Sequence, residues 1–211
     1  MSLARLIVVP LAVVVALTTE VLAGPSWNMG ADWSMSSNPN GAWSYGRKWD
    51  MEGGSFESMS LHWSYGWMST YWYPSMQAGA DGINLWANDN ARGYPVVRWT
   101  CADPGFYRLT TRFTGYDSRG NDNLVYVTIN GSVHFSDHIV PSFDTADYLI
   151  DSIYLNQGDH IDFSAAWNGG VPAAYGWTVV AATIAPVPEP GTLSLLAIGG
   201  LALIRRRRTA Q

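Results

Sequence analysis

The chain has 211 residues, of which 13% are aromatic and 14% charged, and its formal net charge at neutral pH is −5. Between two apolar terminal segments, residues 24–186 carry seven basic and fifteen acidic side chains, which gives this central region a net charge of −8. Because so acidic a surface repels phosphates, nucleic acid is excluded as a partner.

The first 23 residues have the pattern of a secretory signal peptide. Arg5 precedes an apolar stretch at residues 6–17, and Val21-Leu22-Ala23 places small or aliphatic side chains before a cut at Gly24. The apolar stretch is about half of the roughly 20 residues that a membrane-spanning helix needs, and an uncleaved N-terminal anchor is the alternative. Either interpretation predicts that the central region is exported.

The first half of the central region repeats the tetrapeptide Trp-Ser-Tyr-Gly at a spacing of twenty residues. Since side chains alternate along a strand, Trp43 and Tyr45 should share one face, and so should Trp63, Tyr65 and Trp67. These rings either fill the core or form an exposed platform on which sugars stack. The second interpretation makes all five residues carbohydrate-stacking candidates.

Carboxylates near these aromatic residues offer an argument for catalysis. A glycosidase needs two carboxylates at a fixed separation, and Asp50, Glu52 and Glu57 form the dense acidic set of this region. Their position around Gly53-Gly54 favours a solvated loop instead. The sequence shows no nucleophile motif, phosphate loop or recognisable triad. We therefore predict that the protein is not an enzyme, with a small secreted glycan-active enzyme as the alternative.

The second half reads as short strands separated by turns. Asn130-Gly131 between two alternating runs is a strong signal for a hairpin with a type I′ turn, which would direct Val125, Val127 and Ile129 into the core. This spacing predicts an all-β fold, an antiparallel β-sandwich of the jelly-roll type, in one domain over residues 24–186. Besides the hairpin, strands are expected at residues 96–100, 106–113, 148–155, 160–167 and 177–184.

Two segments contain residue types that bind metal ions. His134 and His138 would lie on one strand face, but no third ligand is evident, so surface histidines are favoured. Asp117–Asn123 is rich in oxygen atoms but lacks the ligand spacing and terminal Glu of an EF-hand. We predict no cofactor or metal, with calcium at this second segment as the alternative.

Several short segments occur in an order that resembles secreted bacterial sandwich domains, which are similar to carbohydrate-binding modules and occur beside PEP-CTERM signals. The resemblance implies a domain of the carbohydrate-binding type. Together with the aromatic residues and the lack of a catalytic motif, it leads us to predict a non-catalytic protein that binds extracellular polysaccharide weakly. The chain departs from the pattern at Cys101, its only cysteine, where alanine is more usual; this residue can fill a small buried site but cannot form an internal disulfide. The segments that carry the resemblance are Val96–Thr100, Pro104–Tyr107, Phe113–Asp117, the hairpin and Gln157–Phe163.

The end of the chain, residues 187–211, combines three features. Pro188-Glu189-Pro190 precedes an apolar stretch at residues 192–204, and Arg205, Arg206, Arg207 and Arg208 follow it. The combination resembles a PEP-CTERM sorting signal. The resemblance implies that exosortase, a membrane processing enzyme of Gram-negative bacteria, recognises the tripeptide.

The same resemblance implies a short C-terminal transmembrane helix over the apolar stretch, with the arginines as a cytoplasmic stop. The stretch is shorter than the roughly 20 residues of a comfortable span, and snorkelling of the arginines would extend it. We therefore expect an exported protein that is anchored in the inner membrane before processing and then reaches the cell surface or the extracellular matrix.

Overall fold

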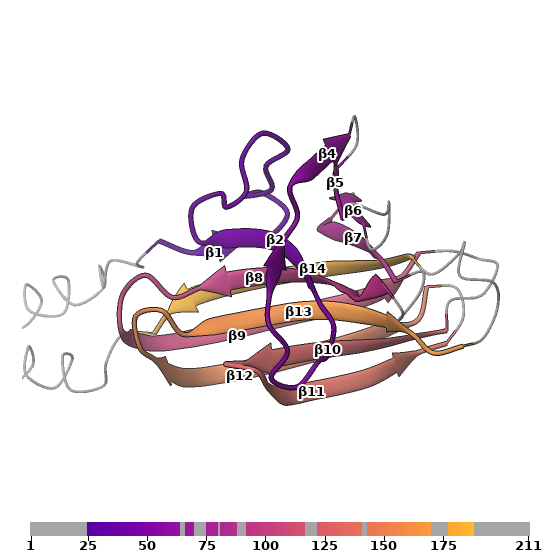
Figure 1. Ribbon diagram of the computed structural model, residues 1–211. Coiled ribbons are helices and arrows are strands. Elements are labelled where there is room, and N and C mark those ends of the chain that lie inside the picture. The colour runs from indigo at the N-terminus through magenta and orange to yellow at the C-terminus, as the bar shows by residue number, and fades with distance from the viewer. Residues whose placement is uncertain are drawn as a thin grey trace, which may run out of the picture.

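The computed structural model describes residues 25–63, 66–69, 75–79, 81–87, 92–116, 122–140, 143–169 and 177–187 (Figure 1). The expected signal peptide, and the sorting signal beyond Val187, lie outside these residues. No helix in the described part of the chain is long and apolar enough to cross a membrane.

Every regular element in the described ranges is a β-strand. The N-terminal strands are β1 (Trp27–Asn28), β2 (Trp43–Lys48), β3 (Glu57–Ser58), β4 (Leu61–Trp63), β5 (Gly66–Met68) and β6 (Ser75–Ala78). The later strands are β7 (Ile83–Trp86), β8 (Tyr94–Thr100), β9 (Gly105–Gly115), β10 (Asn123–Ile129), β11 (Ser132–Ile139), β12 (Thr145–Leu155), β13 (His160–Trp167) and β14 (Trp177–Pro186).

The strands form two antiparallel sheets with the core between them. Sheet A has the order β12-β9-β14-β7-β6-β5-β4, with β1 also paired to β14, and sheet B has the order β11-β10-β13-β8-β2-β3. From β7 onward, the chain crosses between the sheets at every connection except the β10–β11 hairpin. The resulting faces, β12-β9-β14-β7 against β11-β10-β13-β8, are those of a jelly roll. The predicted all-β jelly-roll sandwich is confirmed.

The β10–β11 hairpin has the predicted turn. Asn130 and Gly131 have φ angles of 51° and 84°, and Ile129 pairs with Ser132 across the turn. Positive φ at both central residues is what a type I′ turn requires, and asparagine followed by glycine tolerates it at little cost. Val125 and Val127 are completely buried and Ile129 is 5% exposed, so the predicted inward face is also confirmed.

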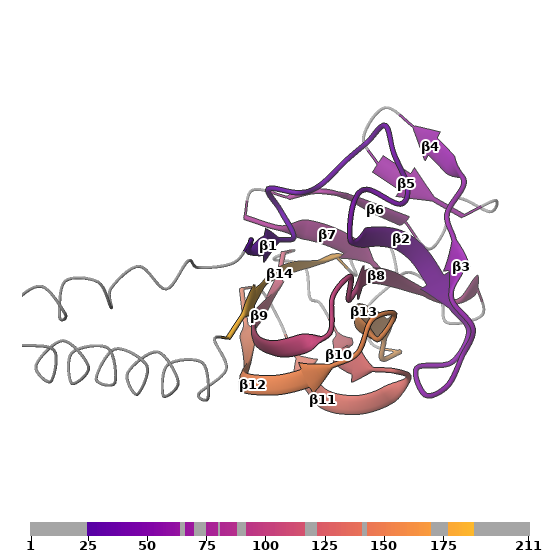
Figure 2. The same cartoon turned by 90° about the vertical axis from the view of Figure 1, so that its left-hand side faces the viewer.

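The N-terminal strands widen both sheets on one side of the jelly roll, β2 and β3 beyond β8 and β6, β5 and β4 beyond β7 (Figure 2). The second Trp-Ser-Tyr-Gly copy is not one strand, because Trp63 ends β4 and pairs with Gly66, the first residue of the antiparallel β5. The expectation that Trp63, Tyr65 and Trp67 share one strand face is therefore wrong.

What the two copies share is a glycine at a close contact. A Cβ on Gly46 would collide with the ring of Phe56, and a Cβ on Gly66 would collide with the carbonyl oxygen of Met76. The repeat thus marks two places where neighbouring segments pack directly on backbone, rather than two equivalent strands.

Substitutions beside the hairpin test this arrangement. Val127→Ala should lower the free energy of unfolding by about 1–3 kcal/mol, because it leaves a cavity in a closely packed core. Thr128 lies on the opposite face but is only 1% exposed, and its hydroxyl has no hydrogen-bond partner among the described residues. Thr128→Val should therefore be neutral within about 0.5 kcal/mol or stabilising. Urea denaturation measures both; equal losses would contradict the register.

Candidate functional site

Three of the expected stacking residues lie in the core. Trp43 is 1% exposed, Tyr45 is not exposed and Trp67 is 7% exposed. The segment at Asp32–Ser34 closes over them: the Trp43 indole donates to the Asp32 carboxylate (3.1 Å), the Ser34 N–H donates to the Tyr45 hydroxyl (3.1 Å) and the Trp67 indole donates to the Ser34 carbonyl (2.8 Å).

These rings offer no open face to a sugar, and we assign them to the core. Tyr45 stacks on Trp67 with ring centroids 6.1 Å apart, and burial raises the pKa of Tyr45 to about 12. The side chains of Trp63 and Tyr65 lie outside the described residues, as do the sorting residues Pro188, Glu189, Pro190 and Arg205–Arg208; their roles stay predictions.

Within the acidic set near the aromatic residues, Glu57 is ion-paired with Arg47. Glu57 accepts hydrogen bonds from the Trp49 indole (2.9 Å) and from Arg47 (2.9 Å), and these lower its pKa, the Trp49 bond most. Asp50 accepts from the backbone N–H of Glu52 (3.1 Å). A glycosidase acid needs a raised pKa so that it carries a proton at neutral pH, and Glu57 has the opposite environment.

The two histidines of β11 do not form a pair. A register shift in the β10–β11 ladder falls at His134 and interrupts the alternation that would place it with His138. His138 instead contacts Asp122, whose carboxylate also accepts from Asn168 (3.1 Å), and the contact with His138 is the main cause of the lowered pKa of Asp122. Within the described residues no three His, Cys, Asp or Glu side chains are placed to hold a metal ion. Most of the calcium candidate, residues 117–121, lies outside them.

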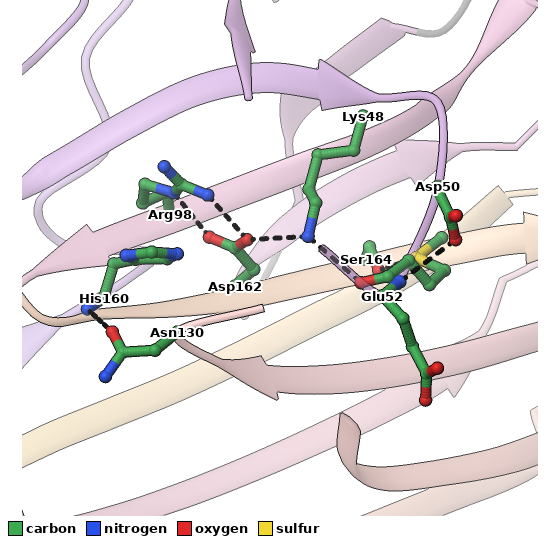
Figure 3. A network of polar contacts seen from close by, with 9 residues as sticks. Lys48, Asp50, Glu52, Arg98, Asn130, His160, Asp162 and Ser164 are labelled. Carbon is green, nitrogen blue, oxygen red and sulfur yellow. Dashed lines mark hydrogen bonds and ion pairs between the residues drawn. The ribbon is translucent and has the colours of Figure 1, made fainter. Parts of the chain in front are cut away.

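A buried ionic network occupies the outer face of sheet B (Figure 3). The Asp162 carboxylate, on β13, accepts two hydrogen bonds from Arg98 of β8 (2.6 and 2.9 Å). It also pairs with the ammonium group of Lys48, which ends β2 (3.4 Å). Lys48 and Asp162 are each only 1% exposed, and Lys48 donates as well to the carbonyl of Met51 (3.0 Å). Since every charge has its partner inside the protein, this network fixes the loop that begins at Trp49.

An open groove of about 830 Å³ crosses the outer face of sheet A. Its floor is made by outward-facing side chains of β12, β9 and β14, while Asn28 of β1 and Asp81, just before β7, border it on the far side. The strand registers set these side chains in three rows across the sheet: Leu149, Thr110, Thr183 and Asn28; Asp147, Arg112 and Ala181; Thr145, Thr114 and Val179.

Threonine hydroxyls and small apolar side chains dominate the floor, and one accessible ion pair crosses it. Arg112 donates two parallel hydrogen bonds to Asp147 (2.7 and 2.9 Å), and both side chains stay more than half exposed. The pair raises the pKa of Arg112 and lowers the pKa of Asp147, so both remain charged. Tyr116, 57% exposed, also lines the groove.

None of these groove residues is among the sequence-predicted site residues. The alternation of polar and apolar residues in Arg108–Thr114 indicates a strand with a polar outer face. Which other strands complete that face depends on the order β12-β9-β14, and this order joins segments more than thirty residues apart.

The buried network predicts a pH dependence through His160. Burial is the main cause of the lowered pKa of His160, and the nearby Arg98 and Lys48 charges lower it further, while Asp162 and Asp159 act in the opposite direction. Between that lowered pKa and the unfolded value of about 6.5, the unfolded chain binds more protons, so stability decreases as the pH falls.

When the pH falls from about 7.5 to about 5.5, the free energy of unfolding of His160→Gln should decrease less than that of the wild type. Urea unfolding at both pH values measures this difference. The measurement at the higher pH separates this effect from any general cost of the substitution. Equal losses in both proteins would show that His160 does not contribute to the acid sensitivity.

Residues 186–208 match the PEP-CTERM protein-sorting motif, so the chain carries this motif as its last residues indicated. The motif implies an exported protein that is sorted through exosortase and anchored in the membrane before processing. No curated protein matches the chain at a significant level.

The comparison with solved structures finds likenesses at low sequence identity and low TM-score. The CBM36-1 domain of a multidomain xylanase from the hindgut metagenome of Trinervitermes trinervoides is 16% identical, over 69% of this chain and 98% of that chain, with a TM-score of 0.35. A carbohydrate-binding module CBM36 in complex with calcium and xylotriose is 14% identical, over 67% and 97%, with a TM-score of 0.34. The vertex protein P5 of PRD1 is 18% identical, over 54% and 70%, with a TM-score of 0.32.

Proposed function

We propose that the protein is a non-catalytic, surface-delivered protein that binds a polysaccharide chain weakly in the groove on sheet A. The observation that carries this proposal is the composition of the groove: rows of threonine hydroxyls and small apolar side chains, beside an accessible Arg112–Asp147 fork and the exposed ring of Tyr116.

The chemistry of the groove matches a sugar chain. A pyranose ring has apolar C–H faces and a rim of hydroxyl groups, so it needs small apolar contacts and hydrogen-bond partners in alternation. Ala181 and Val179 provide apolar floor, and Thr110, Thr114 and Thr183 provide hydroxyls beside it. An open groove over three strands accommodates a chain that continues at both ends, and a hydroxyl-rich ligand tolerates the acidic surface that repels phosphates.

The environment of the Asp147 carboxylate favours binding over hydrolysis. A glycosidase needs one carboxyl group with a raised pKa to protonate the leaving oxygen. The pKa of Asp147 is instead lowered by its hydrogen bonds to Arg112. Asp147 thus adds hydrogen-bonding capacity to the groove in a form unsuited to protonating a glycosidic oxygen, which supports a binding protein rather than the glycan-active enzyme.

Variants of the groove test the proposal by affinity electrophoresis on a panel of neutral and uronic polysaccharides. Tyr116→Ala should weaken retention roughly tenfold, because the exposed ring is the large stacking surface among the groove residues. Ala181→Trp should abolish retention, because the indole fills the floor. Since the contacts are mostly uncharged, added salt should change wild-type retention little.

Tyr154→Ala is the matched control. Tyr154 is 50% exposed, like Tyr116, but packs against Phe106 away from the groove. Its removal should leave retention unchanged, and thermal melts should show all three variants folded. Wild-type protein that no polysaccharide retains, or equal retention of folded Tyr116→Ala, would refute the groove as the binding site.

The sorting motif predicts proteolytic processing. In the native host, the protein extracted from the cell surface should have lost its tail near Pro188-Glu189-Pro190, because the tripeptide directly precedes the apolar stretch. Intact-mass measurement checks this. Recovery of protein that still carries Arg205–Arg208, in a host with an active exosortase, would contradict it.

A further inference from the structure

The two chain ends of the folded domain lie side by side at one end of the sandwich. β1 and β14 are antiparallel neighbours, with Trp27 opposite Ile184, so the start of one strand meets the end of the other (Figures 1 and 2). A hollow of about 250 Å³ at this end is lined by Pro25, Trp27, Phe106, Pro186 and neighbouring residues. The sorting motif therefore leaves the domain from a defined surface.

The strand that leads into the motif is held on both sides. β14 pairs with β9 from Thr178 to Pro186, which lies opposite Tyr107, and with β7 and β1 on its other edge. One residue later, the Val187 N–H donates to the carbonyl of Phe106 (2.7 Å). The ladder of sheet A thus holds the chain up to the residue before Pro188.

The described part of this ladder ends at Val187, whose N–H is its last donor to β9. Pro188 and Pro190 follow, and neither has an N–H group with which to add a strand hydrogen bond of its own. From Val187 to Gly191, five residues span at most about 17 Å before the apolar stretch begins at Thr192. A folded domain is therefore tied within this distance of the membrane.

We propose that the folded domain restricts exosortase processing, because the enzyme must open the end of β14 to bind the chain on the N-terminal side of the tripeptide. A processing enzyme holds its substrate extended on both sides of the scissile bond, and here Pro186 and Val187 are already engaged by β9. The surface that meets the enzyme is the end of the sandwich around Val187, Phe106 and Trp27. This inference rests on the proposed cleavage near the tripeptide.

An insertion that leaves both the domain and the motif intact tests the inference. Gly-Ser-Gly-Ser-Pro-Val is added after Val187, so that Pro186 and Val187 stay in the sheet and a second Pro-Val precedes Pro188. In the native host, pulse–chase labelling should show precursor conversion roughly fivefold faster than in wild type, because the cleaved segment no longer has to leave the ladder.

The matched control places the same six residues after Val140, which is 46% exposed and directly follows β11 at the end of the sandwich opposite Pro186. It should be processed at the wild-type rate, and thermal melts of the soluble domains should confirm that both insertions fold. If wild-type protein is cleaved but the insertion after Val187 leaves the rate unchanged or slows it, this inference fails while the proposed processing stands. If wild-type protein is not cleaved near the tripeptide, both fail.

Discussion

The carboxylate of Asp162 joins the N-terminal half of the chain to the jelly roll. It binds Arg98 within the jelly roll and Lys48 at the end of β2, all under a loop that also contributes the Met51 carbonyl. Removing one member of such a buried set leaves an uncompensated charge, which typically costs about 3–5 kcal/mol. The ladder between β2 and β8 and this network together tie β2, which carries Trp43 and Tyr45, to the jelly roll.

Local signals in the sequence predicted much of the fold. Asn130-Gly131 specified both the turn and the inward face of β10, and the strand at residues 160–167 was predicted with its observed bounds. These signals depend on neighbours in the chain. The stacking candidates depended on something else, because burial of Trp43 and Tyr45 requires the segment at Asp32–Ser34 to close over them. The alternation of residues within β2 does not indicate that a segment elsewhere in the chain covers its aromatic side chains.

The residues of the groove could not be predicted from the sequence for a related reason. In the sequence, Thr110, Arg112 and Thr183 are polar residues at alternate positions of a strand, a pattern that is typical of any strand face exposed to solvent. They become a site only because β9 lies between β12 and β14, so that residues far apart in the chain fall into common rows. A binding surface built across strands is a property of topology, and the jelly-roll order had to be known before its rows could be assembled.

The positions of the groove and of the anchored end are compatible with both proposed roles. β9 runs away from the end where β14 leaves the domain, since Tyr107 pairs with Pro186 and Thr114 pairs with Val179. The groove residues of β9, from Thr110 onward, therefore lie in the half of the sandwich that is remote from the membrane tether. A domain held close to the bilayer would still present this face to polysaccharide outside the cell, and release of the tail would change its location without altering the groove.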